Sequence, residues 1–393
     1  MLSTTTKADI DRQSKLDKFL KRYLMGENKV DLYREYEAIL RSAKPLDLFH
    51  ISHFEIGGLL PIDEIRRHAG RFVNLFSHGL NAYVWDRSKL PLIRLLLLEN
   101  EAIMERLLAL KPSLARDQIE KATGSIEDFL GEMAELDKKF IKMQNVIFPV
   151  MEAIFPKSAV FKVLWIVHDD LVEKRNKLIE LLRSDPYSLS DLIKAIGEYY
   201  YELAGLIQKE DAILLPVMSE VMGNEQLEAM LQSCYDIGFA FLKDYNKDRS
   251  SKTIEVKEST ITTNSGKITL EQFLLIMGHL PISITYVDEF DKVVYYNEQK
   301  TRHFPRTPQA IGREVRNCHP EKSVHIVEEI IKRFRDGSKD QAVFWFDHND
   351  HKLLIRYLAV RDEHGRYRGV LETSEDITEY GDYQGVKRLL DWE

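Results

Sequence analysis

The sequence has few cysteines. Cys234 and Cys318 are the only two among 393 residues, and they lie far apart. A disulfide framework needs several cysteine pairs, and a four-cysteine zinc site needs four thiolates, so both are excluded. A chain of this length can bury its hydrophobic cores without covalent cross-links.

Long apolar runs and an excess of positive charge are also missing. Runs such as Leu95 to Leu98 are far shorter than the ~20 residues that cross a bilayer. The polar start of the chain, MLSTTTKADIDRQSK, lacks the apolar stretch of a secretory signal. The net charge of −8 does not suggest a nucleic-acid footprint. We therefore expect a soluble, cytoplasmic protein with no membrane and no nucleic-acid partner.

Catalytic motifs are not found either. The sequence contains no glycine-rich phosphate loop and no GxSxG elbow. It also shows no histidine-kinase ATP domain and no helix-turn-helix signature. We expect a protein that is not an enzyme.

The first ~245 residues have a helical pattern instead. Apolar residues recur at helical spacing over residues 15–24 and 33–40, and a further helix is predicted near Pro61, after the Gly57-Gly58 break. From about residue 90 to 242, long amphipathic segments are separated by short breaks at proline or glycine. This arrangement predicts an antiparallel four-helix bundle.

The pattern changes near residue 245. Tyr245 to Gly266 is rich in Ser, Thr and Lys, and we interpret it as a linker that contains a short strand at Thr253–Val256. The residues beyond it predict a small α+β domain whose five strands form an antiparallel sheet. The segments predicted there are a helix over 270–277, a hairpin over 283–297, a helix over 321–335, and strands over 342–346, 353–361 and 367–374.

The order of these elements, closed by Asp376-Ile377-Thr378, resembles a PAS sensor domain. The runs GREVRNCHPEKSVHIVEEI, IRYLAVRDEHGRYRGVLE and KRLLDW are similar to one PAS subgroup. In that subgroup the PAS domain follows a hemerythrin-like bundle, which is itself preceded by a helical domain of unknown function. The resemblance implies a multidomain chain with an all-α first half. Its implied parts are the helical domain (1–88), the bundle (89–245), the linker (246–266), the PAS domain (267–380) and an exit helix (381–393).

The bundle lacks most of the residues that hold iron in hemerythrins. Those proteins bind two irons through histidines and carboxylates on the helices. Of the twelve histidines here, only His168 lies between residues 90 and 270. Compared with the family pattern, Leu90 and Lys139 stand where histidines are expected, and Gln144 replaces a glutamate. We expect no di-iron site, with His168 and Glu210 as remnants of the ligand set.

His168 and Glu210 each share a helical face with leucines, so both side chains are predicted to point inward. Buried charge is costly unless it is paired. We therefore expect a His168–Glu210 pair, with Gln144 close enough to join it. We expect no other convergent polar cluster in the bundle, so the PAS domain is the predicted place for a ligand.

Cys318-His319-Pro320 comes just before the long helix of the PAS region. Ligands of PAS domains lie between this helix and the inner face of the sheet. The predicted ligand-binding residues are therefore Cys318, His319, Val327, Ile331 and Tyr357. His325 lies about 160° around the helix from Val327 and should face away from the cleft.

Two interpretations of this segment stay open. A haem could be held through the His319 imidazole or the Cys318 thiolate. Alternatively, the segment is a helix-start motif whose imidazole bonds to the backbone. The resemblance implies a sensory or regulatory protein whose PAS domain binds a small molecule or partner. A scaffold that only contacts proteins and a haem-binding PAS protein are the alternatives, and a homodimer or a protein partner fits each of them.

Overall fold

The structure is a computed structural model in which the chain divides into two compact units, Met1–Ser250 and Ser251–Glu393. Each unit is described by itself. The structure describes residues 6–51, 74–87, 91–115, 118–156, 158, 160–184, 188–243, 245, 260–299, 302–383 and 385–386.

The first unit begins with three helices, α1 (Lys7–Leu24), α2 (Lys29–Arg41) and α3 (Pro45–Ile51). Thr6 and Asp9 form a capping box at the start of α1, and the Asn28 side chain accepts from the Val30 N–H at the start of α2. These helices confirm the two patterns predicted there. The helix predicted near Pro61 falls outside the described residues.

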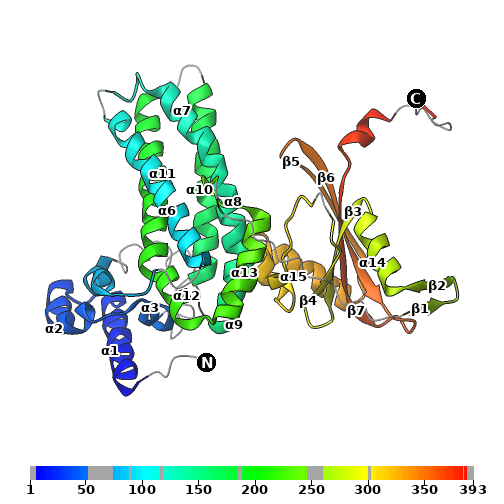
Figure 1. Ribbon diagram of the computed structural model, residues 1–393, viewed down its shortest axis with the longest axis horizontal. Coiled ribbons are helices and arrows are strands. Elements are labelled where there is room, and N and C mark those ends of the chain that lie inside the picture. Colours follow the sequence, from blue (N-terminus) through cyan, green and yellow to red (C-terminus); the bar gives the residue numbers. More distant parts are fainter. Residues whose placement is uncertain are drawn as a thin grey trace. The chain divides into compact units, whose positions relative to one another are not determined.

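Further helices follow, and the longest of them run side by side as the predicted bundle (Figure 1). They are α6 (Pro91–Leu110), α7 (Thr123–Glu132), α8 (Leu136–Lys142), α9 (Phe148–Ile154), α10 (Val160–Arg183), α11 (Leu189–Lys209), α12 (Leu215–Val221) and α13 (Asn224–Ile237). The chain from α7 to α9 forms one nearly continuous helical segment, and the chain from α11 to α12 forms another. The helix α13 packs against α6 and α8.

Each of these two continuous helical segments contains one π-helical turn. These turns are η4 (Met143–Ile147) and η5 (Glu210–Leu214). Pro149 and Pro216 lie just beyond them. Proline has no N–H and its ring excludes the carbonyl four residues earlier, so the preceding turn widens. The wider turns lie next to the buried charged residues described below.

One hydrophobic cluster joins α1–α3 to the bundle. Phe49 of α3 packs against Phe155 and Phe161, with ring centroids 5.0 and 5.8 Å away. Because the two predicted parts, 1–88 and 89–245, share this core, they fold as one compact unit.

The second unit contains a five-stranded antiparallel sheet with the order β4-β3-β7-β6-β5, as predicted. Its strands are β3 (Ile282–Asp288), β4 (Val293–Tyr296), β5 (Gln341–His348), β6 (His351–Arg361) and β7 (Tyr367–Asp376). The helix α14 (Leu270–His279) precedes the sheet, and α15 (Glu321–Arg335) lies between β4 and β5 in sequence. The helix α15 packs on one face, and Ile331 and Phe334 anchor it there against Val287 and Val370.

Two boundaries differ from the prediction. Part of the segment interpreted as a linker is ordered, because β1 (Thr260–Thr263) pairs with β2 (Gly266–Thr269). The end of the predicted PAS region is a short 3-10 helix, η8 (Thr378–Asp382). The strand predicted at 253–256 and most of the predicted exit helix lie outside the described residues. Among the helices that are described, none combines the length and apolar character needed to cross a membrane.

Candidate functional sites

The centre of the bundle holds a cluster of charged and polar side chains, which contradicts the expectation that it has none besides a His168–Glu210 pair. All but one of its members are fully buried. They come from α6, from α8 and from the start of η5. The members are Glu99, Asn100, Lys139, Lys142, Glu210 and the partly buried Asp211.

Lys139 is the central cation of this cluster. Its Nζ lies 2.7 Å from Glu210 Oε2, donates to Asn100 Oδ1 at 2.7 Å, and lies 3.7 Å from Glu99 Oε2. Asn100 in turn donates from Nδ2 to Asp211 at 2.7 Å. The ammonium is therefore surrounded by oxygen atoms, as a buried charge requires.

Lys142 connects α8 to the residues that follow α13. Its Nζ donates to Glu99 Oε1 at 2.7 Å and to the Gly238 carbonyl at 2.8 Å. The same Glu99 oxygen accepts from the Ala240 N–H at 2.6 Å. The last turns of the unit are thus held by charge-assisted hydrogen bonds made inside its core.

The pKa values of the two lysines shift in opposite directions. Burial acts to lower the pKa of Lys139, but the negative charges of Glu210 and Glu99 outweigh it, and its pKa is raised. For Lys142 burial dominates over Glu99, and its pKa is lowered. Burial also raises the pKa of Glu210, against the opposing effect of Lys139. The negative charges that face Lys139 therefore favour its protonated form.

His168 does not pair with Glu210, so that prediction is wrong. The imidazole is stacked on Phe140 at 4.4 Å and on Phe148 at 5.7 Å. Neither ring nitrogen has a hydrogen-bond partner among the described residues. Burial, and then the charge of Lys139, lowers the pKa of His168 to about 3. Glu210 prefers Lys139 because an ammonium offers a full charge, whereas this imidazole is neutral at pH 7.

In the second unit, the predicted ligand residues mostly belong to the core between α15 and the sheet. Ile331 is a buried member of this core, and Cys318, Val327 and Tyr357 pack against it. His325 is exposed, as predicted.

The His319 and Cys318 side chains lie against backbone carbonyls at the start of the 3-10 helix η7 (Val315–Cys318). His319 Nδ1 lies 2.8 Å from the Val315 carbonyl, and Cys318 Sγ lies 3.6 Å from the Glu314 carbonyl. Burial lowers the pKa of His319. These contacts match the helix-start interpretation, in which the imidazole bonds to the backbone.

The inner face of the sheet also carries polar residues that the sequence reasoning missed. Glu372 is buried on β7, directly beside Thr285 and Tyr357 on the neighbouring strands. Arg306 reaches Glu372 at 3.4 Å, and Arg302 donates to Thr285 Oγ1 at 3.1 Å. Burial, and then the charge of Glu372, raises the pKa of Tyr357 above its ordinary range. The loop after β4 therefore covers the inner face with charged as well as apolar contacts.

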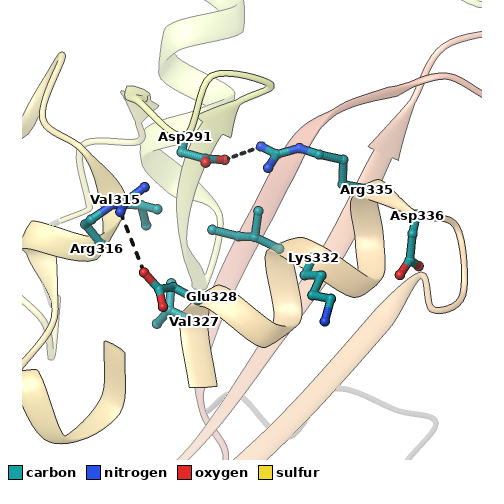
Figure 2. A pocket seen from close by; sticks show the side chains of 9 residues that line it. Asp291, Val315, Arg316, Val327, Glu328, Lys332, Arg335 and Asp336 are labelled. Atoms are coloured by element: carbon teal, nitrogen blue, oxygen red, sulfur yellow. Dashed lines mark hydrogen bonds and ion pairs between the residues drawn. The ribbon is translucent and has the colours of Figure 1, made fainter. Parts of the chain in front are cut away.

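A pocket of about 410 Å³ lies beside α15. Val315, Val327 and Ile331 contribute its apolar lining. Figure 2 shows Asp291 facing Arg335 and Arg316 facing Glu328. The first pair is 2.7 Å apart and the second 3.7 Å. The pocket thus includes two of the five predicted ligand residues, Val327 and Ile331. Cys318, His319 and Tyr357 are not part of its lining.

Comparisons with known proteins agree with both units. Residues 92–218 match the model of the hemerythrin HHE cation binding domain, and residues 274–378 match a PAS domain model. The chain belongs to the hemerythrin-like/PAS domain proteins. A search of curated proteins gives no match to it.

Several solved structures are similar to part of this chain. One is the C-terminal domain of a protein from Streptococcus mutans, 34% identical, covering 32% of this chain and 97% of that one with a TM-score of 0.31. A second is a PAS domain from Colwellia psychrerythraea (22% identity, 28% and 98% covered, TM-score 0.23). A third is the VqmA–ligand–DNA complex from Vibrio cholera (20% identity, 32% and 62% covered, TM-score 0.23).

The hemerythrin-like bundle does not fit the two-iron centre that its family implies. A di-iron centre in a helical bundle uses several imidazoles and carboxylates. Here one histidine lies in the bundle, and the Lys139 ammonium sits near both Glu210 and Glu99. Within the described residues of the bundle, no three His, Cys, Asp or Glu donors come close enough to share one ion.

Sequence reasoning missed Lys142 and the contacts of Glu99, although one signal was present. Lys139 shares a helical face with Leu136, Phe140 and Met143, all of them buried. A lysine on such a face must find a carboxylate inside the core. Nothing in the sequence indicates that the Gly238 carbonyl accepts a hydrogen bond from Lys142. Any backbone carbonyl can do so once the fold brings it close.

Proposed function

We propose that this hemerythrin-like/PAS protein is a sensory or regulatory protein whose PAS domain binds a small molecule. The PAS domain supports a sensory or signalling role at a general level. Our proposal includes no catalytic activity, a cytoplasmic location, and a bundle that works without a di-iron centre. The net charge of −8 argues against a nucleic-acid partner, and that part of the proposal rests on charge alone.

The pocket beside α15 carries the proposal. Its volume of about 410 Å³ is within the range of ligand pockets, and its lining combines three apolar side chains with six charged ones that could orient a ligand. Val315, Val327 and Ile331 would contact an apolar body. Lys332 also lines the pocket and would offer a positive charge to an anionic group.

Native mass spectrometry of the full chain tests this proposal. Protein purified without denaturation should carry a bound small molecule, and Val327→Arg should lose it because a guanidinium would fill the pocket. Ile326→Arg is the matched control, since Ile326 is an exposed neighbour on the same helix and does not line the pocket. A bound mass that survives in Val327→Arg, or that both variants lose equally, contradicts this placement.

In the bundle, we propose that lysine ammonium groups take the role that metal cations have in hemerythrins. Lys139 and Lys142 neutralise Glu99 and Glu210 and hold the helices together through them. Elemental analysis of the full chain, expressed with added iron and dialysed, should find fewer than the two irons per chain of a di-iron centre. A value near two would contradict the proposal.

A protein-interaction role is a second candidate, favoured by the exposed apolar side chains of β5. Trp345 is 65% exposed and Val343 is 38% exposed, on the same face of the strand. A homodimer or another protein could cover them. Light scattering should then show that Trp345→Ser lowers the average mass.

A haem-binding PAS domain, the remaining alternative, would give a Soret band in the absorbance spectrum.

A further inference from the structure

Three ligand-type side chains meet at one end of the PAS sheet, away from the pocket beside α15. His351 is the first residue of β6, and Asp376 is the last residue of β7. His303 comes from the loop after β4. One donor atom from each lies within 4.8 Å of the other two. Three elements distant in sequence therefore bring two imidazoles and one carboxylate together.

The distances are close to those of a metal centre. His303 Nε2 lies 3.5 Å from Asp376 Oδ2, and His351 Nδ1 lies 2.6 Å from the same oxygen. An ion about 2.1 Å from each ligand in a tetrahedral site holds those ligands about 3.4 Å apart. The first distance already has this value. The second is a hydrogen bond, and it would lengthen when an ion replaces the shared proton.

The carboxylate is held so that one oxygen stays directed at the imidazoles. Asp376 Oδ1 accepts from the N–H of Thr378 at 2.9 Å and from its hydroxyl at 2.5 Å. The Thr378 hydroxyl oxygen also accepts from the Lys352 N–H at 2.8 Å. Such outer hydrogen bonds orient the ligands of metal sites. They leave Asp376 Oδ2 facing both histidines.

The local turn explains how the histidines come to lie here. Asn349 and Asp350 have positive φ values of 49° and 65°, which is the geometry of a two-residue hairpin loop. This turn places His348 directly opposite His351. The His348 ring lies 5.4 Å from Phe304, the residue after His303. The loop after β4 is thus packed against the β5–β6 turn, and His348 is a third imidazole beside the cluster.

We propose that His303, His351 and Asp376 bind a divalent transition-metal ion through Nε2, Nδ1 and Oδ2. Two imidazoles and a carboxylate suit zinc, cobalt or nickel better than calcium or magnesium, which prefer oxygen ligands alone. Three protein ligands leave a coordination position open for water or another ligand. The ion would connect the loop after β4 to the end of β7, just before η8.

Cobalt and zinc titrations of the full chain test this site. The chain, free of any histidine tag and treated with a chelator, should bind one Co²⁺ with visible absorption from an imidazole-bound ion, and Zn²⁺ should displace it. His303→Ala, His351→Ala and Asp376→Asn should each weaken binding by about tenfold or more. Thr378→Val should weaken it by up to about tenfold, because it removes the hydroxyl that helps the Thr378 N–H to orient Asp376.

Two controls make the outcome decisive. His364→Ala removes a histidine that is 65% exposed in the same domain and should leave binding unchanged. Glu210→Gln should also leave it unchanged, because Glu210 belongs to the bundle. Failure of the full chain to bind cobalt, or binding that survives in His351→Ala, overturns the proposal. An ion lost only in Glu210→Gln would place the metal in the bundle. The other two ligand variants decide the result if one variant does not fold.

Discussion

At the scale of single residues, His168 shows how burial without a partner sets a charge state. The imidazole is enclosed by Phe140 and Phe148 and has no hydrogen-bond partner among the described residues. Desolvation disfavours the charged form, so the folded protein holds His168 neutral well below the pH at which an ordinary histidine takes up a proton. The consequence is a pH dependence of stability.

We predict that the wild-type chain loses stability relative to His168→Phe as the pH falls from 7 to 4. The folded pKa of His168 is about 3, below the unfolded value of about 6.5. Between these values the unfolded chain binds more protons, so the His168 contribution is complete above pH 6.5 and fades below it, by at most about 1.4 kcal/mol per pH unit. Denaturant unfolding of both proteins at several pH values measures this difference. A difference that stays constant would show that His168 does not titrate in this way.

Lys139 is the second residue whose role can be isolated. Lys139→Met should destabilise the first unit by about 3–5 kcal/mol, because it leaves Glu210 buried without its cation. The double variant Lys139→Met/Glu210→Gln should recover part of this loss, since Glu210 is then uncharged and Glu99 keeps its ion pair with Lys142. Lys138→Met is the matched control: this neighbouring lysine pairs with Glu135 at the surface, and its loss should cost no more than about 0.5 kcal/mol. Equal losses in Lys138→Met and Lys139→Met would contradict the buried cluster.

The sequence correctly predicted that the residues of the bundle site are buried, but it did not predict which residues pair with each other. That His168 and Glu210 are buried follows from helical periodicity, which needs only local information. Which partner a buried charge selects depends on distances between helices. Only His168 was expected to pair with Glu210, and the folded arrangement places Lys139 there instead.

At the scale of helices and strands, sequence patterns predicted the structure more accurately than they predicted the partners of buried charges. The predicted helix over 321–335 has the bounds of α15, and the three C-terminal strands differ by a few residues at their ends. These elements have strong periodicity and clear stops, such as Gly337 with its positive φ of 78°. The π-helical turns were not predicted, because a proline marks a disturbed helix but does not say which hydrogen bonds replace the lost one.

Gly369 in β7 is a position where only glycine fits. Its φ is 136°, and an added Cβ would lie 2.1 Å from the Val287 carbonyl oxygen on β3. We predict that Gly369→Ala destabilises the PAS domain by about 2 kcal/mol or more, because the two central strands must move apart. Thermal unfolding followed by circular dichroism measures the loss. Gly381→Ala, where an added Cβ meets nothing within 4 Å, should change little. A stable Gly369→Ala variant would mean that the β3–β7 pairing is looser than described.

At the scale of the whole molecule, the chain has two separate hydrophobic cores. One joins α1–α3 to the bundle, and the other lies between α15 and the sheet. The sequence predicted this division, because the residue pattern changes from helical to strand-rich across residues 245–266. It did not predict that the N-terminal helices and the bundle share a core, since that depends on contacts such as Phe49 with Phe161, between residues distant in sequence.

Separate cores predict that each unit responds to its own substitutions. Calorimetry of the full chain should resolve two unfolding transitions, because few interactions inside one core depend on the other. Lys139→Met should lower the midpoint of one transition, and Gly369→Ala should lower the midpoint of the other. A molecule that binds beside α15 should raise only the midpoint that Gly369→Ala lowers, because binding stabilises the unit that holds the ligand. If both variants shift a single common transition by similar amounts, the two units unfold together. Binding of a ligand to the PAS domain would then also change the free energy of unfolding of the bundle.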